Sequence, residues 1–193
     1  MFTPTDPAAT PLTTEETLDL IPTHITNKAA LNAAEQQNIL LAERWVIKGN
    51  RGVVNEMFSR KLHHKMFGQV WRWAGEYRNK ALNIGSNALE ITPSTIQLMD
   101  DVHFWLNQQT YSRDEIAVRF HHRLTQIHAF PNGNGRHARL MADLLLLKHR
   151  QPRFTWGRLS LVNPSQTRKH YIKSLQQADR EYNYDLLLKF ARS

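Results

Sequence analysis

Apolar residues recur at helical spacing through most of this chain, and turn-forming residues mark where each predicted helix ends. The clearest run covers residues 27–48, where apolar positions return every three or four residues and Gly49 follows as a helix-ending residue. Capping residues such as Ser112 and a helix-opening residue, Pro93, predict further helices in the same way. The predicted helices cover residues 13–21, 27–48, 53–71, 92–108, 112–128, 135–148, 163–178 and 182–192.

One stretch breaks the helical pattern. Between Gly75 and Thr92, two short apolar runs flank a cluster of turn residues at 85–87, which predicts a β-hairpin over residues 78–91. About eight helices with one hairpin indicate the all-α class. Because strands and helices do not alternate along the chain, a doubly wound nucleotide-binding fold is excluded.

The amino-acid composition indicates that the protein binds an anionic partner. The chain has 193 residues, with 25 Lys and Arg against 17 Asp and Glu, and a formal net charge of +8. Such a balance favours nucleotides, phosphates or nucleic acids as partners. The absence of cysteine excludes thiolate catalysis and cysteine-based metal sites. No run approaches the ~20 apolar residues of a membrane-spanning helix, and the first ten residues lack a secretory signal. We therefore expect a soluble, cytoplasmic protein without a membrane partner.

The candidate chemistry is concentrated in residues 128–139, with the sequence HAFPNGNGRHAR. The pattern predicts a helix end, a glycine-bearing turn and a new helix start. Unpaired N–H groups and the positive end of the helix dipole favour an anion at such a start. Gly133 and Gly135 remove Cβ atoms there, so that the backbone can approach a ligand closely.

Three side chains of this segment extend the prediction. Arg136 and Arg139 are three residues apart and lie on one face of the predicted helix, and their forked guanidinium groups suit phosphate oxygens. His128 stands at the end of the preceding helix, and a histidine can accept a proton near neutral pH. The segment therefore predicts a site for a di- or triphosphate beside an imidazole.

The same segment resembles the signature of the Fic/Doc family, H-x-F-x-(D/E)-G-N-G-R-x-x-R, at every fixed position except Asn132. Residues 67–78, FGQVWRWAGEYR, are similar to the family's segment before its hairpin. The resemblance extends over about residues 25–190 and is closest to the subgroup called mobile mystery protein B, found on bacterial mobile elements. It implies the helical Fic fold.

The resemblance also implies a domain organisation. An N-terminal arm and a short helix would occupy residues 1–25, and the Fic domain would occupy residues 26–193. The core of that domain is expected at about residues 53–150, with the C-terminal helices at 163–192. Three of the eight prolines lie in the first eleven residues, which is typical of such an arm.

A Fic-type protein adenylyltransferase is the activity that the resemblance implies. Such an enzyme moves AMP from ATP to a Ser, Thr or Tyr hydroxyl of a target protein. His128 would deprotonate this hydroxyl for attack on the α-phosphate, and pyrophosphate would leave. Phe130 would anchor the loop in the core. The polyphosphate would be held by the turn and the helix that follows, through Gly133, Asn134, Gly135, Arg136 and Arg139.

Asn132 stands where the family pattern has an acidic residue. An Asp or Glu would hold Mg²⁺ through a charged oxygen, whereas an amide oxygen coordinates the ion without that charge. Two alternatives follow: Mg²⁺ binds more weakly, mostly through the phosphates of ATP, or the reaction is altered. The histidines at positions 63, 64, 103, 121, 122 and 137 lack a zinc-binding spacing, and we expect them at the surface or half-buried.

Two further elements of the family have counterparts here. Glu35 corresponds to a glutamate that, in some Fic proteins, pairs with the second arginine of the signature and blocks ATP. It would then pair with Arg139; alternatively, it lies on a solvated helix face. The hairpin corresponds to the family's flap, which clamps a target by strand addition, although a plain hairpin that covers the core is the alternative. The flap residues expected to bind the target are Asn83, Ile84 and Gly85.

Three functions remain open on the sequence. Besides AMP transfer, these are a Doc-like protein kinase, which binds ATP reversed and transfers the γ-phosphate, and a catalytically weak module that binds a nucleotide or DNA. Gly135 and Arg139 favour AMP transfer, because they leave room for the terminal phosphates in the usual orientation, whereas Asn132 favours the weak module. The expected partners are a target protein and an antitoxin or regulator. Nucleic acid is not expected, because the basic C-terminal third carries no recognition-helix or RNA-binding signature.

Overall fold

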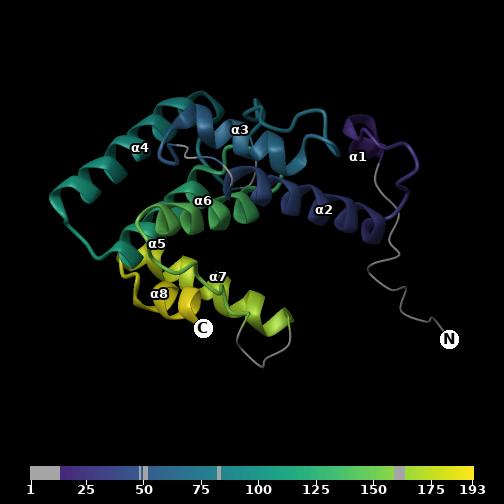
Figure 1. Cartoon of the computed structure of the whole chain (residues 1–193). Helices are drawn as coiled ribbons and strands as arrows, with labels where there is room; N and C mark the ends of the chain where they lie inside the picture. Colours follow the sequence, from purple (N-terminus) through teal and green to yellow (C-terminus); the bar gives the residue numbers. More distant parts are fainter. Residues whose placement is uncertain (1–13, 48, 50–51, 82–83, 159–163) are drawn as a thin grey trace.

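The computed structural model describes residues 14–47, 49, 52–81, 84–158 and 164–193, and this part of the chain is helical (Figure 1). Its α-helices are α1 (Thr14–Asp19), α2 (Lys28–Ile47), α3 (Glu56–Phe67), α4 (Ile91–Gln108), α5 (Arg113–Ile127), α6 (Asn134–Lys148), α7 (Pro164–Glu181) and α8 (Asp185–Arg192). A short 3₁₀ helix, η2 (Ala88–Glu90), leads directly into α4. The predicted all-α class is confirmed.

Helices α5 and α6 form the centre of the fold. They pack along each other, with α4 against α5, α3 against α6 and α2 against α3 (Figure 1). The α7–α8 pair packs on the C-terminal side, where α8 contacts α5. Large side chains fill the core between these layers, and each one contributes ~1.5–3 kcal/mol by leaving water; among the most buried are Phe67, Phe120, Phe130, Leu62 and Met141. Within the described residues, no helix combines the length and the apolar character needed to cross a membrane.

Several helix boundaries differ from the sequence-based prediction. Helix α3 ends at Phe67 because Gly68 caps it and donates its N–H to the His64 carbonyl at 2.7 Å. Helix α4 begins at Ile91, so that Pro93 lies inside its first turn, where a missing N–H costs no helical hydrogen bond. Helix α7 continues past the predicted end, to Glu181. The expected cap at Thr13 and the expected start of α7 at residue 163 lie outside the described residues.

The predicted β-hairpin over residues 78–91 is wrong for the part that the structure describes. Residues 78–81 and 84–91 contain no strand, and residues 82–83 lie outside the described range. The backbone of this loop bonds instead to the segment after α5: Arg78 N–H donates to the Ala129 carbonyl at 2.9 Å, and Ser86 N–H donates to the Ile127 carbonyl at 3.1 Å. The apolar residues that suggested strands do not share a buried face, since Leu89 is 89% exposed.

Four histidines that we expected at the surface or half-buried lie buried in the core: His63, His121, His122 and His137. His137 Nε2 lies 3.0 Å from the Ser59 carbonyl, and His121 Nε2 lies 3.0 Å from the hydroxyl of Tyr171. Burial lowers the pKa of His137 to about 4 and that of His121 to about 3. Both rings are therefore neutral in the folded protein at ordinary pH.

We expect the free energy of unfolding to fall as the pH drops below about 6.5, the ordinary pKa of histidine. Between that pH and about 4, the unfolded chain protonates His137 while the folded chain does not, so stability is lost as pH falls. Together with His121, this predicts a loss of roughly 4 kcal/mol between pH 7.5 and pH 5, measured by urea unfolding. His137→Gln should reduce the slope by up to ~1.4 kcal/mol per pH unit. An unchanged slope would count against a buried neutral His137.

Candidate active site

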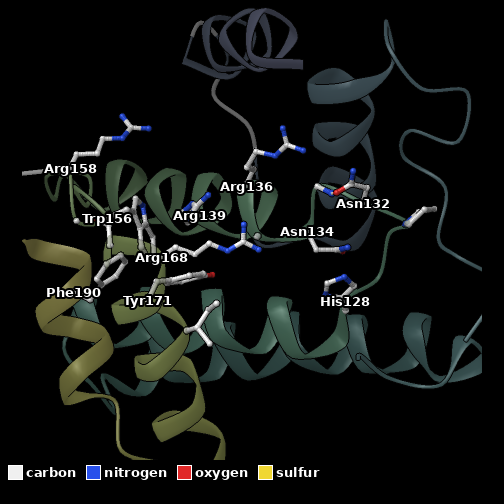
Figure 2. Close-up of a pocket in the computed structure, with 16 residues that line it drawn as sticks. His128, Asn132, Asn134, Arg136, Arg139, Trp156, Arg158, Arg168, Tyr171 and Phe190 are labelled. Atoms are coloured by element: carbon white, nitrogen blue, oxygen red, sulfur yellow. The ribbon is translucent and has the colours of Figure 1, made fainter. Parts of the chain in front are cut away.

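The segment that the sequence singled out lines a cavity of about 800 Å³. Its other walls come from the loop before α7, from α7 and from α8 (Figure 2). No Asp or Glu of the described residues lines this cavity, whereas four arginines do, so it favours an anion, and its volume is in the range of small-molecule sites. The four arginines are Arg136, Arg139, Arg158 and Arg168.

His128 lies at the edge of this cavity, directly after α5. It caps the helix in the left-handed conformation, with φ 51° and ψ 55°, and its N–H donates to the Leu124 carbonyl. The side chain is half-buried. Burial lowers the pKa of His128, the positive charge of Arg78 lowers it further, and a hydrogen bond to the Thr125 carbonyl partly opposes both effects. The imidazole is therefore neutral at pH 7 and can accept a proton.

The loop after His128 is fixed by Phe130 and Asn134. The Phe130 ring is buried and stacks on His63, with ring centroids 3.7 Å apart and an interplanar angle of 13°. Asn134 Oδ1 accepts the Phe130 N–H at 2.9 Å, and Asn134 Nδ2 donates to the Phe130 carbonyl at 2.7 Å. The Asn134 side chain therefore stabilises the loop. Only the backbone N–H of Asn134 remains available to bind an anion at the start of α6.

The two glycines of the loop have different surroundings. Gly133 precedes α6 with φ +80°, and a Cβ there would lie 2.6 Å from the Phe67 ring. At Gly135, the nearest atom to an added Cβ is the Tyr171 hydroxyl oxygen at 3.9 Å. Gly133 is therefore required by backbone conformation and by packing, whereas the space beside Gly135 belongs to the cavity.

The two arginines of the segment also differ. Arg136 lies over the Phe67 ring, and its Nη1 donates to Glu35 Oε2 at 2.7 Å. Arg139 lies over the Tyr171 ring, 5.5 Å from its centroid, and no carboxylate of the described residues forms an ion pair with it. Burial lowers the pKa of the Arg139 guanidinium, which remains charged at any ordinary pH.

The ion pair of Glu35 corrects the sequence-based prediction, which gave Arg139 as its partner. Glu35 is 3% exposed, so it does not lie on a solvated helix face. Its Oε1 accepts the Trp71 Nε1–H at 2.6 Å, which holds the carboxylate on the side of α2 that faces Arg136. The pair forms with Arg136 because this is the arginine of the first turn of α6, beside the Phe67 end of α3, and α2 packs against α3.

Asn132 does not supply the donor set of a resident Mg²⁺. Its Oδ1 already accepts the Gly133 N–H at 2.6 Å, and its backbone carbonyl lies 3.0 Å from His63 Nε2. No group of three or more His, Cys, Asp or Glu residues in the described part of the chain could hold a metal ion. The protein offers the ion one neutral oxygen, and Mg²⁺ is usually bound in proteins by carboxylates together with substrate phosphates.

The C-terminal wall of the cavity was not predicted from the sequence. A buried carboxylate, Asp143 on α6, holds the loop of this wall: its Oδ1 accepts the Trp156 Nε1–H at 3.0 Å and the Phe154 N–H at 3.2 Å. The only sequence feature that points to this wall is the excess of Lys and Arg in the C-terminal third, and no local motif marks the residues that form it. Its lining residues include Trp156, Arg158, Arg168, Tyr171 and Phe190.

A second cavity, of about 750 Å³, adjoins the first. His128 lines both of them, so the imidazole stands at their junction. Of the three flap residues expected to bind a target, Ile84 and Gly85 line the second cavity, and Asn83 lies outside the described residues. The side chains opposite come from α5 and α7 and include Arg123, Gln126, Ile172, Leu175 and Asp179.

Arg78 joins the flap loop to His128. Its side chain is buried, and its Nε donates to the His128 carbonyl at 2.7 Å. Its Nη1 donates to the Lys80 carbonyl at 2.9 Å, and its Nη2 donates to the Ser86 carbonyl at 2.5 Å. One guanidinium group therefore fixes the base of the loop and the backbone of His128, and it also brings a positive charge close to the imidazole.

Arg78→Met should raise the pKa of His128 toward its ordinary value, because a positive charge near the imidazole is removed. The titration of the His128 ring, followed by NMR, measures this shift without any assay of activity. Arg72 is an exposed arginine of the same segment, and Arg72→Met should leave the titration unchanged. Equal titration curves for all three proteins would contradict the electrostatic role of Arg78.

The chain is thus a helical domain in which a neutral imidazole, several arginines and a helix N-terminus face one cavity that favours an anion. Residues 54–146 match the family model described as "Fic/DOC family". This part of the chain therefore belongs to the Fic/DOC family, as the resemblance of the sequence implied.

Curated relatives and solved structures agree with this assignment. The chain is 29% identical over 109 residues to "Protein adenylyltransferase fic-1" of Caenorhabditis briggsae; the match covers 55% of this chain and 20% of that protein. The N-terminal FIC domain of the Bartonella effector Bep8 superimposes with a TM-score of 0.69 at 14% identity, covering 88% of each chain. BepC of Bartonella tribocorum, with bound AMPPNP, gives a TM-score of 0.66 at 14% identity and 87% coverage of each chain. At these identities, the two structures establish the fold.

Proposed function

We propose that this protein transfers AMP from ATP to a Ser, Thr or Tyr hydroxyl of a target protein. The observation that carries the proposal is the position of a neutral, half-buried imidazole at the mouth of a cavity whose described lining residues include four arginines and no Asp or Glu. The names of the curated relatives support the same activity, although the chain spans about a fifth of the length of the first of them. Bound AMPPNP in BepC supports ATP as the nucleotide.

Each step of this reaction has a residue that suits it. The imidazole of His128 takes the proton of the target hydroxyl, and the oxygen attacks the α-phosphorus of ATP. The bond between the α-phosphorus and the bridging oxygen breaks, and pyrophosphate leaves. Arg136, Arg139 and the N-terminal N–H groups of α6 hold the β- and γ-phosphates and stabilise the charge of the leaving group.

The target would bind in the second cavity, because His128 faces both cavities. Ile84, Ile172 and Leu175 give this cavity an apolar side, and Arg123 and Asp179 bring both signs of charge. Its walls fit an amphipathic segment of a protein. A cytoplasmic location, where ATP is available, belongs to the same proposal.

Several expectations stay predictions. They are the limits of the Fic domain at residues 26–193, the mobile mystery protein B subgroup with its link to mobile elements, and an antitoxin or regulator as partner. Mg²⁺ also remains a prediction. The side chains here do not fit a resident ion, so any Mg²⁺ in the reaction would have to arrive on the phosphates of ATP.

Glu35→Gln should raise the rate of AMP transfer about ten-fold, which corresponds to ~1.4 kcal/mol. In this structure, Arg136 is engaged by the Glu35 carboxylate, and a triphosphate must compete for it. The amide keeps an acceptor for Trp71 but removes the charge. Glu43 lies on the same helix and forms an ion pair with Arg153, so Glu43→Gln is a matched control without an effect on the rate. An unchanged rate in Glu35→Gln would exclude inhibition through this pair.

Labelled ATP tests the proposed function. Purified Glu35→Gln protein and a cell lysate are incubated with ATP carrying the label on the α- or on the γ-phosphate. Transfer of the α-label to protein supports AMP transfer, and transfer of the γ-label alone supports the protein kinase. Binding of ATP without any transfer would indicate the catalytically weak module.

A further inference from the structure

A triphosphate that enters the cavity carries several negative charges, and few of the described residues that line this cavity bring a positive charge to the side of His128. Of the four arginines of the cavity, Arg136 is already paired with Glu35. Arg139 lies further along α6 and over Tyr171. The charge that develops around the α-phosphorus during transfer is best stabilised by a positive group fixed beside the imidazole, because such a group does not have to reorganise during the reaction.

Arg168 meets this requirement. Together with His128, Gly135, Tyr171 and Ile172, it lines both cavities, so it stands where nucleotide and target would meet. Figure 2 shows its side chain extending from α7 into the cavity, toward the end where His128 and Asn134 lie, whereas Arg158 lies at the opposite end. No carboxylate of the described residues forms an ion pair with Arg168.

Arg168 matters because the side chains around the cavity do not fit a resident metal ion that could supply positive charge to the α-phosphate. A divalent cation beside the α-phosphate would need charged oxygens from the protein, and this cavity has no acidic side chain among the described residues. Asn132 offers one amide oxygen, which already accepts the Gly133 N–H. A guanidinium group supplies positive charge and paired N–H donors to phosphate oxygens without any metal.

We propose that Arg168 binds the α-phosphate oxygens and stabilises their charge during transfer, so that this protein transfers AMP without Mg²⁺. The inference rests on the proposed AMP transfer. The bonds that form and break are those of that reaction: the hydroxyl oxygen bonds to the α-phosphorus, the bond to pyrophosphate breaks and His128 receives the proton. Arg168 donates hydrogen bonds only and remains charged throughout.

The experiment compares transfer of α-labelled AMP in excess EDTA and in Mg²⁺, with Glu35→Gln as the parent of all variants. The parent should keep its rate in EDTA within a few-fold. Arg168→Ala should lose roughly a hundred-fold in EDTA, and Arg168→Lys should lose less, because it keeps the charge without the fork. Lys169, the exposed neighbour on α7, lines neither cavity, so Lys169→Ala should match the parent.

A double variant tests whether Mg²⁺ can replace the positive charge of Arg168. Asn132→Asp adds a carboxylate to the loop, so Asn132→Asp with Arg168→Ala should regain activity in Mg²⁺ but not in EDTA. Loss of the parent's transfer in EDTA, with recovery in Mg²⁺, would overturn the proposal. So would an Arg168→Ala variant that is as active in EDTA as the parent.

Binding of ATP in EDTA, measured by calorimetry, separates this proposal from the AMP-transfer proposal. Arg168→Ala should weaken binding about ten-fold, whereas Lys169→Ala should not. If no protein transfers the α-label in either buffer, AMP transfer is refuted, and the binding result alone decides whether Arg168 contacts the nucleotide. Equal affinities for the parent and Arg168→Ala would overturn the role of Arg168 in either case.

Discussion

Replacing His128 by alanine should lower transfer of the α-label by roughly 10²–10⁴-fold, the usual contribution of a positioned base. The imidazole stands at the junction of the two cavities, and among the residues that the structure describes no other histidine lines the cavity of the arginines. The ring is half-buried beside the loop and not part of the packed core, so folding should be unaffected. ATP binding should change little, because the arginines and the start of α6 are retained.

The pH profile gives an independent check of the same residue. The pKa of His128 is lowered by burial and by Arg78, so the acidic limb of the rate profile should lie below about 6.5. His170 is an exposed histidine on α7, and His170→Ala should keep both the rate and the profile. Full transfer by His128→Ala would show that another group accepts the proton.

Gly133→Ala should be the most damaging change to the phosphate loop. Alanine would have to adopt φ +80°, at a cost of ~1–3 kcal/mol, and its Cβ would lie 2.6 Å from the buried Phe67 ring. Relief of this overlap requires the loop to move, which displaces the first N–H groups of α6 from the phosphates. We expect a loss of stability of about 2–5 kcal/mol and a loss of transfer of at least a hundred-fold.

Gly135→Ala is the matched control for stability. At this position the nearest atom to the added Cβ is 3.9 Å away, so the free energy of unfolding should stay within about 0.5 kcal/mol of the parent. Urea unfolding of the three proteins measures this free energy. If Gly133→Ala unfolds like Gly135→Ala, the contact with Phe67 does not constrain the loop.

The sequence predicted those parts of the molecule that depend on neighbouring residues. Helix α5 begins after Ser112, whose side chain accepts the Glu115 N–H, as the capping pattern indicates. The turn at residues 129–133 and the helix after it follow from glycines and an apolar repeat within one short segment. Such signals are local, because capping and helical periodicity act over a few residues.

The features that the sequence did not predict depend on distant partners. Glu35 and Arg136 are 101 positions apart, and their pairing depends on how α2 packs against α3. The loop after Arg78 has the two apolar runs and the turn residues of a hairpin, yet its backbone groups bond to residues near 127–129 and to the Arg78 side chain. Pattern reasoning cannot tell a strand from an extended loop when the acceptors lie fifty positions away in the chain.

The wall formed by α7 and α8 was missed for the same reason. Asp143 has no sequence neighbour that marks it as a buried carboxylate, and its role depends on the loop at residues 153–156. The Tyr171 side chain, which lines the cavity, is held by a hydrogen bond between its hydroxyl and the buried His121 ring. Net charge indicated an anion site, but only the packing of the C-terminal helices shows which basic residues reach it.

The orientation of the nucleotide can be seen in a crystal structure of the Glu35→Gln protein with a non-hydrolysable ATP analogue. We expect the β- and γ-phosphates at the start of α6, on Arg136 and Arg139, and the α-phosphorus beside His128 at the junction of the cavities. A triphosphate bound in the opposite direction, with the γ-phosphorus beside the imidazole, would contradict AMP transfer. An analogue bound away from the arginines would contradict the assignment of this site altogether.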